Sequence, residues 1–146
     1  MVLIQSTNKK YKWFAYTVFI GLLPILARLI TNLFLDNIAW LSASDFIAFG
    51  FVMHISILNE LEHMHDDDNW KSINNGASIG GVFIYGVFTL GLLIHETGAT
   101  QIDAEMLKYC SMASSIISFI LAYMVFDRLS AKSKDSSQGD STCSVI

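Results

Sequence analysis

The chain has 146 residues, of which 53% are hydrophobic and only 15% are charged. Soluble domains carry about 25% charged residues, so this chain has too few charges to cover a water-facing surface, which argues against a small soluble enzyme. Thirteen acidic and nine basic residues leave a net charge of −4. Without a basic excess, direct nucleic-acid binding by this chain is not expected. The composition indicates an integral membrane protein.

Four apolar blocks follow one another along the chain, and each is long enough for a helix that crosses the roughly 30 Å hydrocarbon core of a bilayer. Their residues do not alternate between apolar and polar as the strands of a membrane β-barrel do. We therefore expect an all-α fold, an integral membrane four-helix bundle without a second domain. The expected spans are about 13–35, 40–61, 73–94 and 106–126, within a transmembrane domain of residues 1–129.

The distribution of basic residues predicts that both termini are cytoplasmic, because Lys and Arg concentrate in short cytoplasmic segments. The first connection, around 36–39, has no Lys or Arg, whereas basic residues flank the first and last spans: Lys9, Lys10, Lys12, Arg128, Lys132 and Lys134. The first span is too long for the apolar part of a cleaved signal peptide. In the third connection, Gly98 fits a helix C-cap and Asp103 fits a helix start.

Residues 130–146 are rich in Lys, Ser, Asp, Gln and Gly. Such a composition cannot bury a core, so we expect a disordered cytoplasmic tail. The last four residues, Cys143-Ser144-Val145-Ile146, fit the prenylation pattern, which has meaning only in a eukaryotic cell and adds little to a chain with four anchors. Cys110 lies inside the fourth span, so no disulfide with Cys143 is expected.

Apart from Glu60 at the exit of the second span, two charged residues lie inside the first two spans, Arg28 and Asp45. A charge at membrane depth costs several kcal/mol unless it is paired or hydrated. Both residues lie at similar distances from the tight first connection, so we predict an ion pair between the spans. The pair either fixes the register of the hairpin or lines a polar path; alternatively, Arg28 extends to the outer interface.

His54 lies deeper in the second span. Histidine changes charge near neutral pH, which allows a proton-relay interpretation. The alternative is a neutral imidazole that hydrogen-bonds between helices, with Ser56 or a serine of the fourth span as its partner.

The densest polar segment follows the second span. It contains Glu60-x-x-His63 and Glu62-x-x-His65, a spacing that di-iron bundles carry on two separate helices; here both copies share one segment, so neither a metal centre nor another cofactor is predicted. Acidic residues at a helix C-terminus oppose the helix dipole and are repelled by an anionic leaflet. We expect the 60–72 loop either to dock a basic surface of a cytosolic protein or to be solvated. The docking residues would be Glu60, Glu62, His63, His65, Asp66, Asp67, Asp68 and Trp70.

Small residues recur at helical spacing in the third and fourth spans. In lipid, close backbone approach holds helices together, so these residues predict packing surfaces, either within one chain or between copies of a homo-oligomer. The predicted packing residues are Gly76, Gly80, Gly81, Ser114, Ser118 and Ala122.

The segment Asp45-Phe46-Ile47-Ala48-Phe49-Gly50 at the start of the second span and Asn59-Glu60-Leu61-Glu62 at its exit, together with the size and four spans, resemble the four-span membrane subunit of the Kiwa anti-phage defence system. The resemblance covers the plan of nearly the whole chain. It implies a bacterial inner-membrane protein that forms oligomers, senses envelope perturbation during phage infection and holds a cytosolic DNA-binding effector.

Two functional classes therefore remain. The first is a non-enzymatic membrane sensor or scaffold that anchors a cytosolic effector. The alternative is a small oligomeric ion channel or transporter subunit whose polar path would use Arg28, Asp45 and His54. No enzyme is expected, because the sequence brings no nucleophile or metal set together.

Overall fold

The computed structural model describes residues 3–35, 39–62, 68–98 and 103–139, with side chains described for 15–35, 39–62, 68–98, 103–129 and 131. This part of the chain forms four helices: α1 (Leu3–Phe34), α2 (Ala43–Glu62), α3 (Asp68–Thr97) and α4 (Ala104–Gly139). Each helix contains a stretch long and apolar enough to cross a membrane, at 15–34, 43–62, 68–97 and 104–129. The predicted all-α class is confirmed, and four helices long and apolar enough to span suggest a multi-pass membrane protein.

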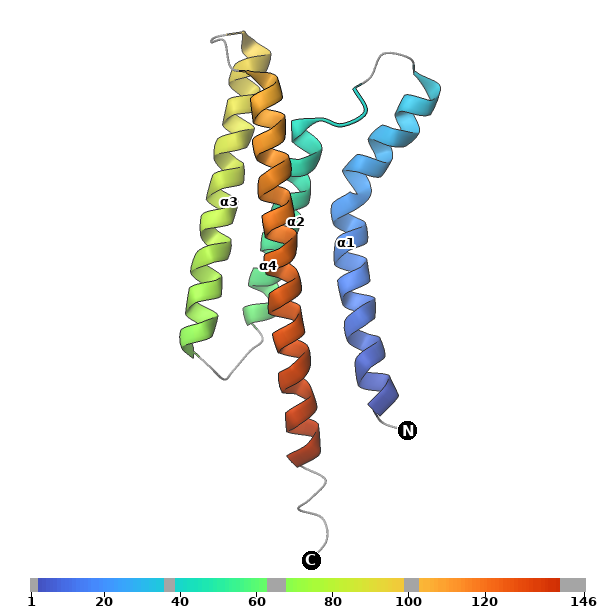
Figure 1. Cartoon of the computed structure of the whole chain (residues 1–146), viewed down its shortest axis with the longest axis vertical. Coiled ribbons are helices and arrows are strands. Elements are labelled where there is room, and N and C mark those ends of the chain that lie inside the picture. The colour runs from blue at the N-terminus through green and yellow to red at the C-terminus, as the bar shows by residue number, and fades with distance from the viewer. Residues whose placement is uncertain (1–2, 36–38, 63–67, 99–102, 140–146) are drawn as a thin grey trace, which may run out of the picture.

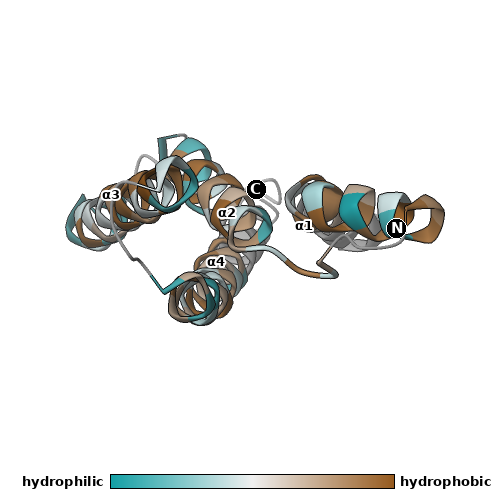
Figure 2. Cartoon of the chain, turned by 90° about the horizontal axis from the view of Figure 1, so that it is seen from above, coloured by the Kyte–Doolittle hydropathy of each residue, from teal (hydrophilic) through white to brown (hydrophobic). Residues whose placement is uncertain are grey.

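Successive helices run in opposite directions, so that the start of α1 and the end of α4 lie at the same end of the molecule (Figure 1). Seen along the helices, α2, α3 and α4 form a cluster and α1 lies to one side, next to α2 (Figure 2). Within the described residues, α2 contacts all three other helices, whereas α1 makes no contact with α3. The bundle is therefore a three-helix core with α1 added to one face of α2.

The apolar core follows the inward face of α2. Met53, Ile57 and Leu61 are fully buried at four-residue spacing and pack with Ala122 and Val125 of α4. The outward face of α3 instead exposes large apolar side chains, namely Ile73, Ile79, Phe83, Ile84 and Val87. An apolar surface of this kind is unfavourable in water and is the expected surface of a helix in contact with lipid acyl chains.

Two helices begin at other residues than expected, because capping interactions and charged residues at the helix ends set their first residues. α2 begins at Ala43 rather than at residue 40, because the Asp45 carboxylate accepts the backbone N–H of Ser42 at 3.1 Å, one half of a capping box. α3 begins at Asp68 rather than at residue 73, with an acidic first turn that suits the positive end of the helix dipole. The predicted loop of residues 60–72 is therefore shorter than expected, and Trp70 belongs to α3.

The ends of the third connection agree with the sequence prediction. Gly98 closes α3 with a φ of 66°, the left-handed conformation that glycine adopts without strain. The Asp103 carboxylate accepts the backbone N–H groups of Glu105 at 2.9 Å and Met106 at 3.2 Å, and so caps α4.

The predicted disordered tail from residue 130 is wrong for its first part, because α4 continues to Gly139. Adding residues to an existing helix is far easier than starting one, and residues 131–138 contain neither Gly nor Pro. Residues 140–146, with the Cys143-Ser144-Val145-Ile146 pattern, lie outside the described residues.

Candidate functional site

The structure forms the predicted ion pair between α1 and α2. The Arg28 Nε atom donates to Asp45 Oδ2 at 2.5 Å, and the Asp45 side chain is only 6% exposed. The same carboxylate oxygen accepts the N–H of Ser42, while Arg28 Nη2 lies 3.4 Å from Ser44 Oγ. Asp45 therefore lies in the first turn of α2, where it caps the helix and fixes α1 at the same time.

A second set of contacts holds α1 further along its length. Thr17 Oγ1 lies 3.2 Å from Ser56 Oγ, so Ser56 bonds to α1 rather than to His54 as one sequence hypothesis proposed. A Cβ on Gly21 would lie 3.0 Å from Phe49 Cδ2, which indicates a close approach of α1 to α2. Pro24 lies inside α1, which is visibly bent in Figure 1; an interior proline is a common cause of such a bend.

The most connected polar group is a junction of three residues from three helices, His54 of α2, Tyr85 of α3 and Ser118 of α4, which we call the polar junction. Ser118 Oγ lies 2.9 Å from His54 Nε2 and 2.8 Å from Tyr85 Oη, and it donates to the Ser114 carbonyl at 2.9 Å. The three side chains are buried. The junction thus joins all three helices of the core at one hydroxyl.

The single proton of that hydroxyl fixes the direction of each bond. A serine has one O–H donor and two acceptor lone pairs, and the Ser114 carbonyl can only accept. When all three bonds form together, Ser118 donates to Ser114 and accepts from both His54 Nε2–H and Tyr85 O–H. Neutral His54 therefore carries its proton on Nε2.

Two glycines let the rings of the junction reach their partners. A Cβ on Gly81 of α3 would overlap the His54 imidazole, and a Cβ on Gly50 of α2 would overlap the Tyr85 ring. Gly50 precedes His54 by four positions in α2, and Gly81 precedes Tyr85 by four positions in α3. Because the two helices are antiparallel, each ring lies against the glycine of the other helix. The contact between α2 and α3 is therefore reciprocal.

The junction does not continue as a hydrogen-bonded path within the described residues. His54 Nδ1 is buried and has no hydrogen-bond partner there. A proton relay needs an uninterrupted series of donors and acceptors, and the described side chains offer no further member beyond Nδ1. The distance between His54 and Ser118 would also suit a Ser–His pair of a hydrolase, but the Ser118 proton points to Ser114 and not to the imidazole.

At the opposite end of α2 from Asp45, the structure describes part of the predicted docking segment. Glu62 and Asp68 are exposed and Glu60 is half-buried. Lys71 Nζ lies 3.4 Å from the Glu62 carbonyl oxygen, where a cation suits the helix C-terminus. His63, His65, Asp66 and Asp67 lie outside the described residues. Among the described residues, no group of three or more His, Cys, Asp or Glu side chains could hold a metal ion.

Trp70, one of the predicted docking residues, packs partly within the bundle. Its side chain is half-buried and packs against the Met53–Leu61 core, and the Arg128 guanidinium lies 4.7 Å from the centre of its ring. This cation–π contact joins α3 to α4. Of the described docking residues, the carboxylates of Glu62 and Asp68 are exposed at this end, whereas Trp70 is half-buried.

The predicted packing residues divide into two groups. Gly81, Ser118 and Ala122 pack inside the core, and Ser114 supplies its carbonyl to the junction. A Cβ on Gly76 or Gly80 would meet nothing within 4 Å, so these two glycines make no close packing contact with the described part of this chain, and packing between copies stays a prediction. Tyr85 was not among the predicted residues. The sequence feature that could have identified it is a tyrosine four residues after Gly81 in an apolar span.

No protein-family model, curated protein sequence or solved structure matches this chain significantly.

Proposed function

We propose that the chain is a membrane-embedded, non-enzymatic scaffold or sensor subunit, with both termini in the cytoplasm, that holds a cytosolic partner at its acidic end. The observation that carries this proposal is the polar junction. It joins α2, α3 and α4 through one hydroxyl group, and the two rings of the junction lie against two glycines. Such packing between three helices favours a rigid frame, as a scaffold requires.

The partner is proposed from the charge of the cytoplasmic end. Glu62 and Asp68 are exposed at this end of the bundle. An anionic leaflet repels nearby carboxylates, and a basic protein surface that faces them compensates this repulsion. We therefore propose a cytosolic protein with a basic patch, which is a property expected of a DNA-binding effector.

The cellular role follows from the resemblance stated above. We propose that the chain forms a homo-oligomer in a bacterial inner membrane and takes part in anti-phage defence, as the membrane subunit of the Kiwa system does. The exposed Gly76 and Gly80 are compatible with contact between copies, because small residues allow close helix approach in lipid.

Charge neutralisation at the acidic end of the bundle, with a matched control at the opposite end, tests the docking proposal. The full chain carrying Glu60→Gln, Glu62→Gln and Asp68→Asn is extracted in mild detergent beside wild type and a matched control, Glu96→Gln with Glu105→Gln at the opposite end. Native mass spectrometry should find one defined protein bound to wild type and to the control, and lost from the acidic-end variant. A partner retained equally by all three proteins would contradict the proposal.

Flux measurements separate a scaffold from the alternative channel. Purified protein in liposomes should give no selective ion flux beyond that of protein-free vesicles. Robust selective flux would overturn the scaffold proposal in favour of an oligomeric pore. Reporter fusions at Met1 and Ile146 should both report the cytoplasm, and reporters on opposite sides would overturn the proposed topology.

A further inference from the structure

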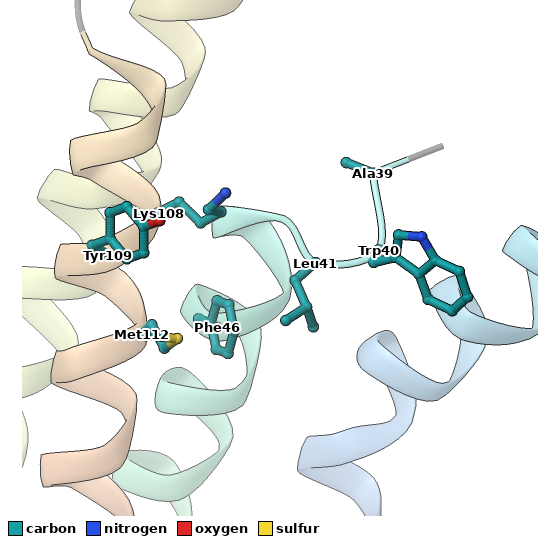
Figure 3. Close-up of a pocket in the computed structure, with 7 residues that line it drawn as sticks. All are labelled: Ala39, Trp40, Leu41, Phe46, Lys108, Tyr109 and Met112. Atoms are coloured by element: carbon teal, nitrogen blue, oxygen red, sulfur yellow. The ribbon is translucent and has the colours of Figure 1, made fainter. Parts of the chain in front are cut away.

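A pocket of about 350 Å³ lies at the end of the bundle opposite the acidic segment (Figure 3). One wall is the segment before α2 with the beginning of α2, and the other is the beginning of α4. Its lining includes Trp40, Leu41, Phe46, Lys108, Tyr109 and Met112. The pocket combines one cation, three aromatic rings and aliphatic or thioether side chains, so its chemistry is amphipathic.

The polarity of the pocket changes in one direction along α4. One face of α4 carries Glu105, Lys108 and Met112, because Lys108 and Met112 follow Glu105 by three and seven residues. Figure 3 shows Lys108 nearest the end of the bundle, with Met112 and Phe46 deeper and on facing helices. Lys108 Nζ lies 3.2 Å from Glu105 Oε1 and 5.4 Å from the centre of the Tyr109 ring. Charge at the rim thus gives way to an apolar floor.

We propose that this pocket binds one zwitterionic aminophospholipid, a phosphatidylethanolamine. The phosphate contacts Lys108, and the beginning of one acyl chain contacts Leu41, Phe46 and Met112. The ammonium group contacts Glu105, which pairs with Lys108 beside the pocket. The inference rests on the proposed membrane placement, which brings the pocket to the bilayer interface. Trp40 and Tyr109 are the residue types that occupy the headgroup level.

Charge decides between headgroups. At this end the described carboxylates of Glu96, Asp103 and Glu105 outnumber Lys108, while Arg28 and Asp45 neutralise each other. An anionic headgroup would meet more carboxylates than cations among the described residues at this end of the bundle, whereas a zwitterion places one charge against each member of the Glu105–Lys108 pair. An exposed ion pair contributes only about 0–1 kcal/mol, so a headgroup replaces it at small cost.

The test uses the full chain in vesicles of equal parts phosphatidylethanolamine, phosphatidylcholine and phosphatidylglycerol, followed by mild extraction and native mass spectrometry of retained lipid. We expect preferential retention of phosphatidylethanolamine. Lys108→Gln should lower this retention about twofold to fivefold, the factor that corresponds to loss of one exposed charge contact. Glu105→Gln should shift the preference toward phosphatidylglycerol, and Lys71→Gln at the opposite end should change neither.

Equal retention of all three lipids, or equal retention by wild type and Lys108→Gln, would overturn the inference and indicate adventitious lipid only. Alkaline carbonate extraction of the same membranes distinguishes failure of the lipid proposal from failure of the proposed membrane placement. Release of the protein by carbonate overturns the membrane placement itself, whereas an integral protein without lipid preference overturns only the assigned pocket.

Discussion

The imidazole ring of His54 occupies the space into which a side chain on Gly81 would project. This close approach brings Nε2 to 2.9 Å from Ser118 Oγ on the third helix of the core. Packing and hydrogen bonding are therefore coupled, because any group that pushes α3 away from His54 also disturbs the polar junction.

Adding one methyl group at Gly81 tests this coupling. Gly81→Ala should lower the free energy of unfolding by about 1–3 kcal/mol, the usual cost of overpacking a well-packed core. Reversible unfolding in mixed detergent and SDS micelles, followed by circular dichroism, measures the change. Gly80→Ala is the matched control: its Cβ meets nothing within 4 Å, and alanine favours a helix over glycine, so its stability should be unchanged or slightly higher. Equal effects at both positions would contradict the described contact.

Removing the Ser118 hydroxyl should cost more than removing a comparable hydroxyl on the same helix. Ser118→Ala leaves both His54 Nε2–H and Tyr85 O–H without their acceptor, and a buried unsatisfied polar group costs about 1–3 kcal/mol. Ser115→Ala is the control, since Ser115 Oγ donates to the Met112 carbonyl within its own helix. Unfolding free energies of the two variants should differ by about 1 kcal/mol or more. Indistinguishable values would show that the junction does not join the helices.

The direction of the Ser118 bonds makes a separate spectroscopic prediction. Neutral His54 should be almost wholly the Nε2–H tautomer, because only that tautomer donates to Ser118. Nitrogen-15 chemical shifts of histidine-labelled protein in micelles report the tautomer, and His54→Gln identifies the signal among the chain's other histidines. Ser118→Ala should yield a mixture of tautomers. A predominant Nδ1–H form in wild type would contradict the assigned bonds.

The sequence was enough to predict the Arg28–Asp45 pair, because two charges beside a short connection have few possible partners in an apolar environment. It was not enough to place Asp45 in the first turn of α2. Hydropathy extended the span back to residue 40, whereas the Ser42 cap decides where the helix begins. Composition sets the approximate position of a membrane helix, and specific end groups set its first residue.

The polar junction shows a different limit of the sequence. Small-residue spacing identified Gly81 together with Gly76 and Gly80, but spacing alone cannot say which face of a helix meets a neighbour in the same chain. That choice depends on the large ring that fills the gap, and the ring comes from another helix. Tyr85 was missed for the same reason: its role depends on Gly50 and Ser118, which lie far away in the sequence.

The ion pair itself allows a quantitative prediction through a double-mutant cycle. Arg28→Gln leaves the Asp45 carboxylate, which is only 6% exposed, without its cation. Removing one partner of a fully buried ion pair lowers the free energy of unfolding by about 3–5 kcal/mol. We expect a smaller loss of about 1–3 kcal/mol, because the Arg28 side chain is 25% exposed. Asp45→Asn should also destabilise, since it weakens the capping interaction with Ser42 as well.

The double variant should be more stable than the sum of the two single losses predicts, because the remaining amides no longer bury an unpaired charge. Lys108→Gln provides the comparison: its pair with Glu105 is exposed and lies within one helix, so its loss should change the unfolding free energy by less than about 0.5 kcal/mol. Strictly additive losses for Arg28→Gln and Asp45→Asn would mean that α1 is held by its contacts at Thr17 and Gly21 rather than by charge.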